Sequence, residues 1–168
     1  FSLSKTKERL EELNLDISTM TRITETITRI KMEDKNYNYK KIYIDDGGMG
    51  VGVYDPLRED EQTKRKVIAV NNATRSKDYE ITMVTEKKEK VKRILKEDLY
   101  NNLLYLMEKG KIFLRKNNET FVSLKSIQYE YNESGRLKIF GNYSHITEAL
   151  IRACWCVKDK TLNISAFC

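Results

Sequence analysis

The sequence has few cysteines and no long apolar runs. Its three cysteines, Cys154, Cys156 and Cys168, are odd in number and include no spaced pair typical of a zinc site. Their spacing argues against a disulfide framework and favours a reducing compartment, which we expect to be the cytoplasm. We interpret Cys154 and Cys156 as small apolar residues on a helix. No apolar stretch approaches the roughly 20 residues of a membrane helix, and no signal-peptide pattern opens the chain.

Proline and histidine are also scarce, with one of each in 168 residues, whereas charged residues are plentiful. Charged residues make up 33% and hydrophobic residues 40% of the chain, which argues against wholesale disorder. The net charge of +6 favours a polyanionic partner such as nucleic acid, although it also fits a plain solvated surface. The length predicts one domain that covers residues 1–168.

Helical and strand patterns alternate along the chain, which predicts an α/β fold with a mixed sheet covered by helices. We expect helical structure at 4–15, 20–30, 51–59, 97–108, 120–126 and 144–158. We expect strands at 41–45, 67–72, 111–114, 127–131 and 136–140, the last two as a hairpin, and a connection at 33–40.

Residues 73–95 are highly charged and are expected to form a mobile excursion that is mostly a solvated face. Its basic side chains are candidates for contacts to phosphate, which would give affinity without reading the base sequence. The candidates are Lys87, Lys88, Lys90, Lys92 and Arg93.

The most informative segment is 42–55, in which an apolar run ends in Asp45 and Asp46 and a glycine-rich turn follows. A strand that delivers a carboxylate to its C-terminal end, beside a turn without bulky side chains, suits metal or phosphate chemistry. Neighbouring strand residues point to opposite faces, so Asp45 and Asp46 are not expected to aim at the same site.

A second motif, at residues 141–150, places the only histidine, His145, three residues before Glu148. Side chains at this spacing share one face of a helix and can converge on one ion. Carboxylate oxygens with one imidazole suit Mg²⁺ or Mn²⁺. The alternative interpretation is an exposed helical turn without a ligand.

Taken together, the two motifs resemble the C-terminal nuclease domain of the large terminase subunit of tailed viruses and proviruses. The pattern Asp-x-x-Gly-x-Gly-x-Gly-Val-x-Asp in 44–55 and the helix that opens with His-x-x-Glu-Ala-Leu in 141–153 carry this resemblance. Residues 99–114, which end in Lys-Gly-Lys-Ile-Phe-Leu, support it, and it covers roughly residues 23–163.

The resemblance implies a ribonuclease H-like fold and an endonuclease that cuts concatemeric double-stranded DNA during genome packaging in the host cytoplasm. It implies two Mg²⁺ or Mn²⁺ ions, with Asp45, Glu148 and His145 as catalytic and metal-binding candidates and Asp46 as a secondary one. The implied partners are DNA, an ATPase motor domain, the small terminase subunit and the portal.

The family pattern also includes a three-stranded meander with a first acid, and no convincing meander is visible before residues 20–30. We therefore expect a chain truncated at its N-terminal side or missing segments, without the first metal ligand. Asp16 is the nearby alternative for that ligand.

Two other functions remain open from the residues. One is a non-catalytic, basic α/β module, such as a decayed proviral fragment, that binds DNA or a packaging partner. The other is a nucleotide-binding domain, which is weaker because the chain has neither a Gly-Lys-Ser/Thr motif nor a Gly-x-Gly-x-x-Gly motif after a strand.

Overall fold

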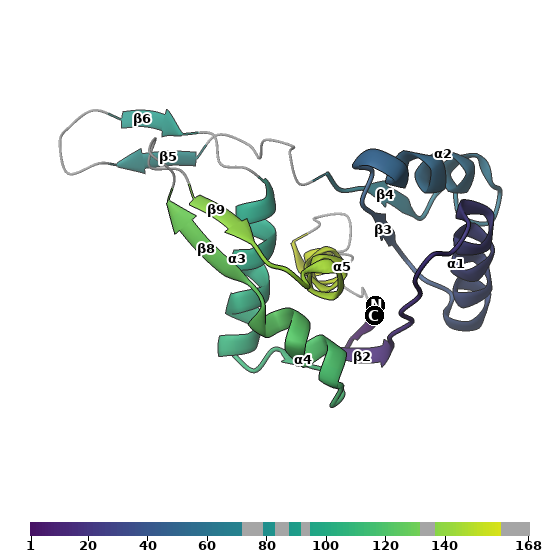
Figure 1. The fold of residues 1–168 in the computed structure, drawn as a ribbon, viewed down its shortest axis with the longest axis horizontal. Coiled ribbons are helices and arrows are strands. Elements are labelled where there is room, and N and C mark those ends of the chain that lie inside the picture. The colour runs from purple at the N-terminus through teal and green to yellow at the C-terminus, as the bar shows by residue number, and fades with distance from the viewer. Residues whose placement is uncertain (72–78, 83–87, 92–94, 132–136, 159–168) are drawn as a thin grey trace.

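The fold is an α/β arrangement, shown in Figure 1 as a computed structural model that describes residues 1–71, 79–82, 88–91, 95–131 and 137–158. Helix α5 lies near the centre, with α1, α2, β3 and β4 on one side and α3, α4, β8 and β9 on the other. In chain order the elements are β1 (Ser2–Lys5), β2 (Leu10–Asn14), α1 (Ile23–Tyr37), β3 (Ile42–Ile44), η1 (Gly48–Gly50), α2 (Val51–Glu59), β4 (Val67–Ala69), β5 (Tyr79–Thr82), β6 (Lys88–Val91), α3 (Leu95–Glu108), β7 (Ile112–Phe113), α4 (Asn118–Lys125), β8 (Gln128–Tyr131), β9 (Leu137–Phe140), α5 (His145–Cys154) and η2 (Trp155–Val157).

The first segment is a β-hairpin, so the helical structure expected at residues 4–15 is wrong. Strands β1 and β2 pair antiparallel, and the hydroxyl of Thr6 accepts a hydrogen bond from the backbone N–H of Arg9 in the turn. Strand β2 also pairs in parallel with β7, which brings Leu10 opposite Ile112. The charged residues in this segment suit a helix locally, but the pairing partner lies about a hundred residues away. Two antiparallel strands therefore do precede the first helix.

Helix α1 runs to Tyr37, so the connection expected at 33–40 begins later than predicted. Asn38 caps the C-terminus of the helix: it adopts a left-handed backbone conformation and donates its N–H to the carbonyl of Asp34. The buried Asp34 carboxylate accepts a hydrogen bond from the backbone N–H of Tyr39 and pairs with Lys66 at 2.8 Å. The buried Asp34 carboxylate thus links the end of α1 to Lys66, directly before β4.

A parallel β–α–β unit follows, and its two strands and helix lie at the positions that the sequence predicts. Strands β3 and β4 are parallel neighbours, with Ile42 opposite Val67 and Ile44 opposite Ala69, and α2 connects them. The unit places the C-terminal ends of both strands at one edge, where parallel α/β sheets commonly carry their functional groups.

Helix α3 ends at Glu108, and the positive φ of 61° and lack of a side chain at Gly110 let the chain turn sharply into β7. The N–H of Lys111 reaches back to the carbonyl of Leu106 at 2.7 Å. The predicted helix stop and the predicted strand at 111–114 are both confirmed.

The hairpin β8–β9 forms at the predicted positions, with Tyr131 opposite Leu137. Helix α4 leaves Phe121 59% exposed and buries Thr120 and Ser123 instead. The helix begins with a side-chain cap, in which Asn117 accepts hydrogen bonds from the N–H groups of residues 119 and 120.

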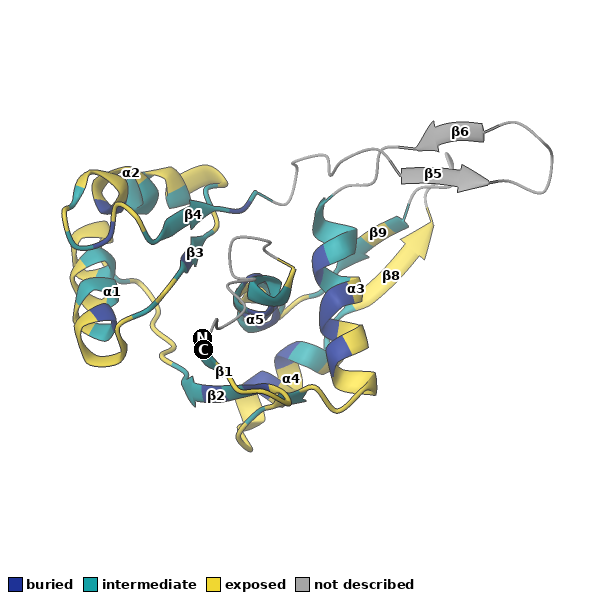
Figure 2. Ribbon diagram, turned by 180° about the vertical axis from the view of Figure 1, so that it is seen from behind, coloured by how far each residue is buried: buried dark blue, intermediate teal, exposed yellow. Residues whose placement is uncertain are grey.

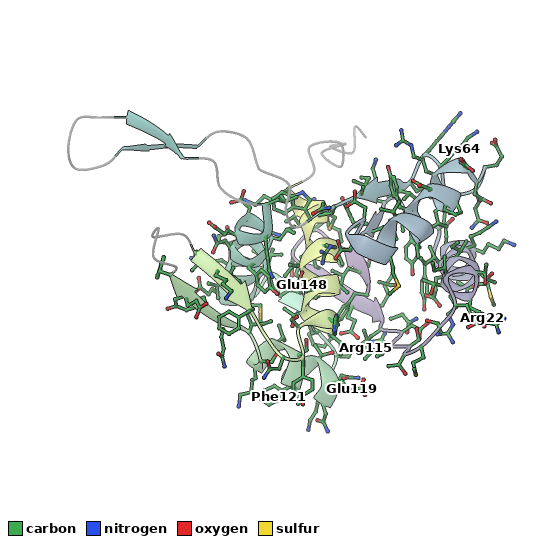
Figure 3. The ribbon with its side chains drawn as sticks, turned by 45° about the horizontal axis from the view of Figure 1, so that its top comes forward. Arg22, Lys64, Arg115, Glu119, Phe121 and Glu148 are labelled. Carbon is green, nitrogen blue, oxygen red and sulfur yellow. The ribbon has the colours of Figure 1, made fainter. Side chains whose placement is uncertain are left out.

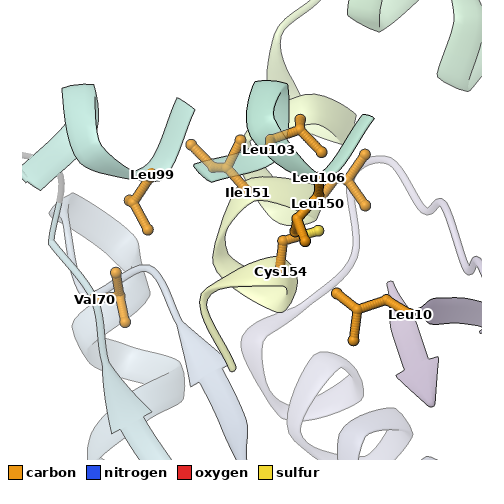
Figure 4. Close-up of a cluster of buried hydrophobic side chains, with 8 residues drawn as sticks. All are labelled: Leu10, Val70, Leu99, Leu103, Leu106, Leu150, Ile151 and Cys154. Atoms are coloured by element: carbon orange, nitrogen blue, oxygen red, sulfur yellow. The ribbon is translucent and has the colours of Figure 1, made fainter. Parts of the chain in front are cut away.

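The main hydrophobic core lies between α3 and α5, as Figure 4 shows. Its buried members are Leu10, Val70, Leu99, Leu103, Leu106, Leu150, Ile151 and Cys154. Figure 2 shows the burial concentrated on the facing sides of these two helices, whereas β8 is exposed. Helix α5 is therefore held rigidly on one side, and its other side is available for polar groups.

The charged segment at 73–95 lies largely outside the described residues. The described part consists of the antiparallel pair β5–β6, with Glu80 opposite Lys90, and the first residue of α3. Among the described residues, no helix is both long and apolar enough to cross a membrane. The α/β class with a mixed sheet, β1–β2–β7, and flanking helices is confirmed.

Replacing Leu150 with alanine tests the importance of the α3–α5 core. Leu150 is fully buried, so Leu150→Ala should lower the free energy of unfolding by about 2–5 kcal/mol. Leu104→Ala is the matched control, because Leu104 is 55% exposed on α3. This substitution should change the free energy of unfolding by about 0.5 kcal/mol or less. Urea unfolding measures both; equal losses would show that the core lies elsewhere.

Candidate active site

Asp45 directly follows β3, and the glycine turn folds back over it. Its Oδ1 accepts a hydrogen bond from the N–H of Gly47 at 3.2 Å, and the side chain is 49% exposed. Gly50 lies so close that a Cβ there would be 1.6 Å from the carbonyl oxygen of Asp45. Glycine at position 50 is therefore a steric requirement of the turn that positions this carboxylate.

Asp46 is placed differently from Asp45. Asp45 lines the large cavity beside α5, and Asp46 is not among the residues that line it. Oδ1 of Asp46 is buried and finds no hydrogen-bond partner among the described residues. The two neighbouring carboxylates are therefore placed differently, in the turn that follows the end of β3 at Ile44.

Glu148 lies on the first turns of α5 and is held by several donors. Its Oε1 accepts a hydrogen bond from the hydroxyl of Tyr100 at 2.8 Å and lies 3.3 Å from the amine of Lys96. Its side chain is only 15% exposed. In Figure 3 the Glu148 label lies on α5, between the ribbons of α3 and α2.

One arginine bridges the two predicted carboxylates. Nη2 of Arg152 lies 2.6 Å from Oδ2 of Asp45, and its Nη1 lies 3.0 Å from Oε2 of Glu148. Asp45 and Glu148, more than a hundred residues apart in sequence, therefore converge on the same guanidinium. Sequence reasoning missed Arg152, although its position four residues after Glu148 places both on one face of the helix.

A cavity of about 590 Å³ opens beside this cluster. Asp45, Glu148, Arg152 and the exposed His145 all line it, so the structure brings the three predicted site residues to one place. Residues of β1 and of β3 also line the cavity. Among the described residues, each of these strands lies at an edge of its sheet. The open space is therefore bounded by strand edges as well as by the carboxylates.

Asp16, the alternative first acid, also lines the cavity but has a different partner. Its Oδ2 lies 3.4 Å from Nη1 of Arg29, and both side chains are about half exposed. Across the described residues, no three His, Cys, Asp or Glu side chains come together as a metal-binding group. Asp16 is thus in the same cavity without joining Asp45 and Glu148.

The donor chemistry of the pair fits a hard divalent cation. Asp45 and Glu148 present carboxylate oxygens that are already gathered around one positive group, and His145 lines the same cavity. Such a pair can hold an ion whose remaining ligands are water or phosphate oxygens. Asp45 and Glu148 could therefore supply carboxylate oxygens to an ion, whereas His145 lines the same cavity without forming a three-residue metal-binding group with them among the described residues.

The predicted phosphate-binding residues cannot be placed in this site. Lys87, Lys92 and Arg93 lie outside the described residues. Lys88 and Lys90 belong to β6, where only the backbone is described. Contacts between these side chains and DNA stay a prediction.

Gly50→Ala should disturb the turn that positions the Asp45 carboxylate. The added methyl group would collide with the backbone of Asp45, so we expect the free energy of unfolding to fall by at least about 2 kcal/mol. Gly48→Ala is the control, because it has a positive φ of 58° but no atom within 4 Å of the new Cβ, and it should cost about 1 kcal/mol. Urea unfolding compares them, and equal losses would contradict the collision.

The pH dependence of stability should report on Tyr100. Burial, and then the negative charge of Glu148, raise the pKa of Tyr100 above its ordinary value. Above about pH 10 the unfolded chain ionises this phenol while the folded chain keeps it neutral, so its contribution is lost as pH rises. Tyr100→Phe should therefore make unfolding free energy fall less steeply between about pH 10 and about pH 12. Urea titrations, each referred to the same variant at neutral pH, measure the slope; an unchanged slope would contradict this role.

The comparisons with known proteins agree on one fold. The sequence profile of the family described as the terminase RNaseH-like domain matches residues 8–150. No curated protein sequence matches the chain.

Two crystal structures of the large terminase nuclease from the thermophilic phage G20c are similar to this chain. The cobalt-bound structure has a TM-score of 0.58 at 15% identity, covering 84% of this chain and 64% of its own. The magnesium-bound structure has a TM-score of 0.56 at 15% identity, with 83% and 62% covered. This chain thus spans less than two thirds of the length of either, and the likeness shows that they share a fold. With a family match over residues 8–150, the chain belongs to the terminase RNaseH-like domain family.

Proposed function

We propose that this chain is the nuclease domain of a large terminase subunit, a metal-dependent endonuclease that cuts concatemeric double-stranded DNA during viral genome packaging. The observation that carries the proposal is the convergence of Asp45 and Glu148 on one positive group at the mouth of a cavity. The family match supports it independently, because these residues lie within the matched region.

The proposed cofactor is Mg²⁺ or Mn²⁺, with two ions in the complete site. Asp45 and Glu148 would hold the metal, and His145 would act as a further ligand or move a proton at the edge of the site. When bound, such ions generate hydroxide and stabilise the leaving oxygen of a phosphodiester. The similar phage structures support this cofactor because they were obtained with bound cobalt and bound magnesium.

The chain's own residues would do three things in this reaction. The glycine turn orients the carboxylate of Asp45, and the rigid α3–α5 core orients that of Glu148. Basic residues of the 73–95 segment would hold the DNA backbone through its phosphates. Double-stranded DNA is therefore the proposed substrate, in the host cytoplasm, with a motor domain, the small subunit and the portal as packaging partners.

A second candidate is a non-catalytic DNA- or partner-binding module. Arg152, Lys96 and Tyr100 satisfy the same carboxylate oxygens that a metal would need. No metal-binding group of three side chains forms within the described part of the chain. An ion-pair network that only stabilises the fold would look the same.

Asp45→Asn separates the two candidates. The amide keeps the size of the side chain but removes the negative charge that a metal requires. We expect Mn²⁺-dependent cleavage of linear double-stranded DNA to fall by at least about a hundredfold, while DNA affinity in the absence of metal stays nearly the same. Gel assays of cleavage and of binding, on the same preparation, measure the two effects.

Asp46→Asn is the matched control, because its carboxylate lies beside Asp45 but does not line the cavity. It should retain cleavage at close to the level of the unmodified chain. If the unmodified chain binds DNA but shows no Mn²⁺-dependent cleavage, the binding module is the better assignment. If Asp46→Asn loses activity and Asp45→Asn keeps it, the site has been assigned to the wrong carboxylate.

A further inference from the structure

We infer that Arg152 is a built-in substitute cation, which holds Asp45 and Glu148 together in the absence of a divalent ion and competes with that ion for them. This inference rests on the proposed metal-dependent function and adds a regulating residue to the same site. It concerns how tightly the chain takes up metal, and it applies whether or not the chain cuts DNA alone.

The positive charge of Arg152 is buried. The Arg152 side chain is 4% exposed, and arginine keeps its charge at any pH that a protein tolerates. A buried cation must be compensated by nearby anions and hydrogen-bond acceptors. Asp45 and Glu148 are the two carboxylates that the guanidinium contacts, at 2.6 Å and 3.0 Å.

The guanidinium of Arg152 is also anchored independently of Asp45. Its Nε donates to the carbonyl of Val70 at 3.2 Å, and Nη1 donates to the backbone carbonyl of Glu148 at 2.7 Å. These two bonds tie Arg152 to the end of β4 and to its own helix. The contact from Nη2 to Asp45 is therefore one that can be given up without releasing the whole side chain.

A divalent metal ion and Arg152 would require the same carboxylate oxygens of Asp45 and Glu148. Oδ2 of Asp45 and Oε2 of Glu148 both face Arg152, whereas Oε1 of Glu148 already accepts from Tyr100. A hard divalent ion binds through such oxygens. The Asp45 side chain is 49% exposed and that of Glu148 only 15%. The Asp45 carboxylate should therefore exchange Arg152 for a metal ion more readily than Glu148 does.

The alternative role for Arg152 is purely structural, and it predicts the opposite result. If the arginine only shapes the site, removing it scatters the carboxylates and weakens metal binding. If it competes with the metal, removing a positive charge a few ångströms away strengthens metal binding. The sign of the change in affinity therefore decides between the two roles.

The experiment measures Mn²⁺ binding to the full chain by isothermal titration calorimetry, without DNA. Arg152→Met should lower the melting temperature in the absence of metal, bind Mn²⁺ at least about tenfold more tightly, and show a larger rise in melting temperature on adding Mn²⁺. Lys66→Met is the matched control, because it removes the cation paired with another buried carboxylate, that of Asp34, away from the cavity. It should lower the melting temperature and leave Mn²⁺ affinity unchanged.

A second measurement does not depend on the folding of a variant. In the unmodified chain with ¹⁵N-labelled arginine, saturating Mg²⁺ should shift the guanidinium Nε–H signal of Arg152, identified by its absence in Arg152→Lys. An unmoved signal at saturation, or Mn²⁺ binding that is equal or weaker in Arg152→Met, would overturn the inference and leave the proposed nuclease intact. Failure of both chains to bind Mn²⁺ would instead overturn the metal site itself.

Discussion

The ion-pair network of Arg152 is the interaction on which the arrangement of the site depends. A guanidinium that is almost fully buried has to be matched by acceptors, and here they come from three separate places in the sequence: Asp45 after β3, Val70 after β4, and Glu148 on α5. The requirement therefore ties the C-terminal helix to the ends of both parallel strands. Removing either carboxylate would leave the buried guanidinium with only one anionic partner.

Helix α5 connects this network to the hydrophobic core. One face carries Leu150, Ile151 and Cys154, which pack with α3, and the other carries Glu148 and Arg152 toward the cavity. Burial also raises the pKa of the Cys154 thiol, consistent with a packing role. Because the same helix serves both purposes, the position of the Glu148 carboxylate follows from apolar packing. The site is rigid on the α5 side and more open on the Asp45 side, where the carboxylate is half exposed.

The glycine turn supplies the second constraint. Gly50 approaches the carbonyl of Asp45 too closely for any side chain, and Gly47 donates its N–H to the carboxylate. Together with the family match over residues 8–150, this geometry gives the glycine spacing of the sequence motif a physical cause. A turn that packs against the backbone of Asp45 cannot carry a side chain at position 50 without moving that residue.

Local sequence patterns were sufficient for the two strands and the helix of 42–69, the end of the helix near 108, the hairpin β8–β9 and the final helix, because each depends on residues close together in the chain. They were also sufficient to select Asp45, Glu148 and His145, which the structure places at one cavity, although their roles stay predictions. Residues 4–15 were misjudged because a charged segment of this kind suits a helix until β7 supplies a strand to pair with. Arg152 was missed because its meaning lies in contacts to Asp45 and Val70, which only the folded chain brings together. Periodicity and turn chemistry thus determined the elements, whereas burial of a charge in the tertiary structure decided which side chains meet.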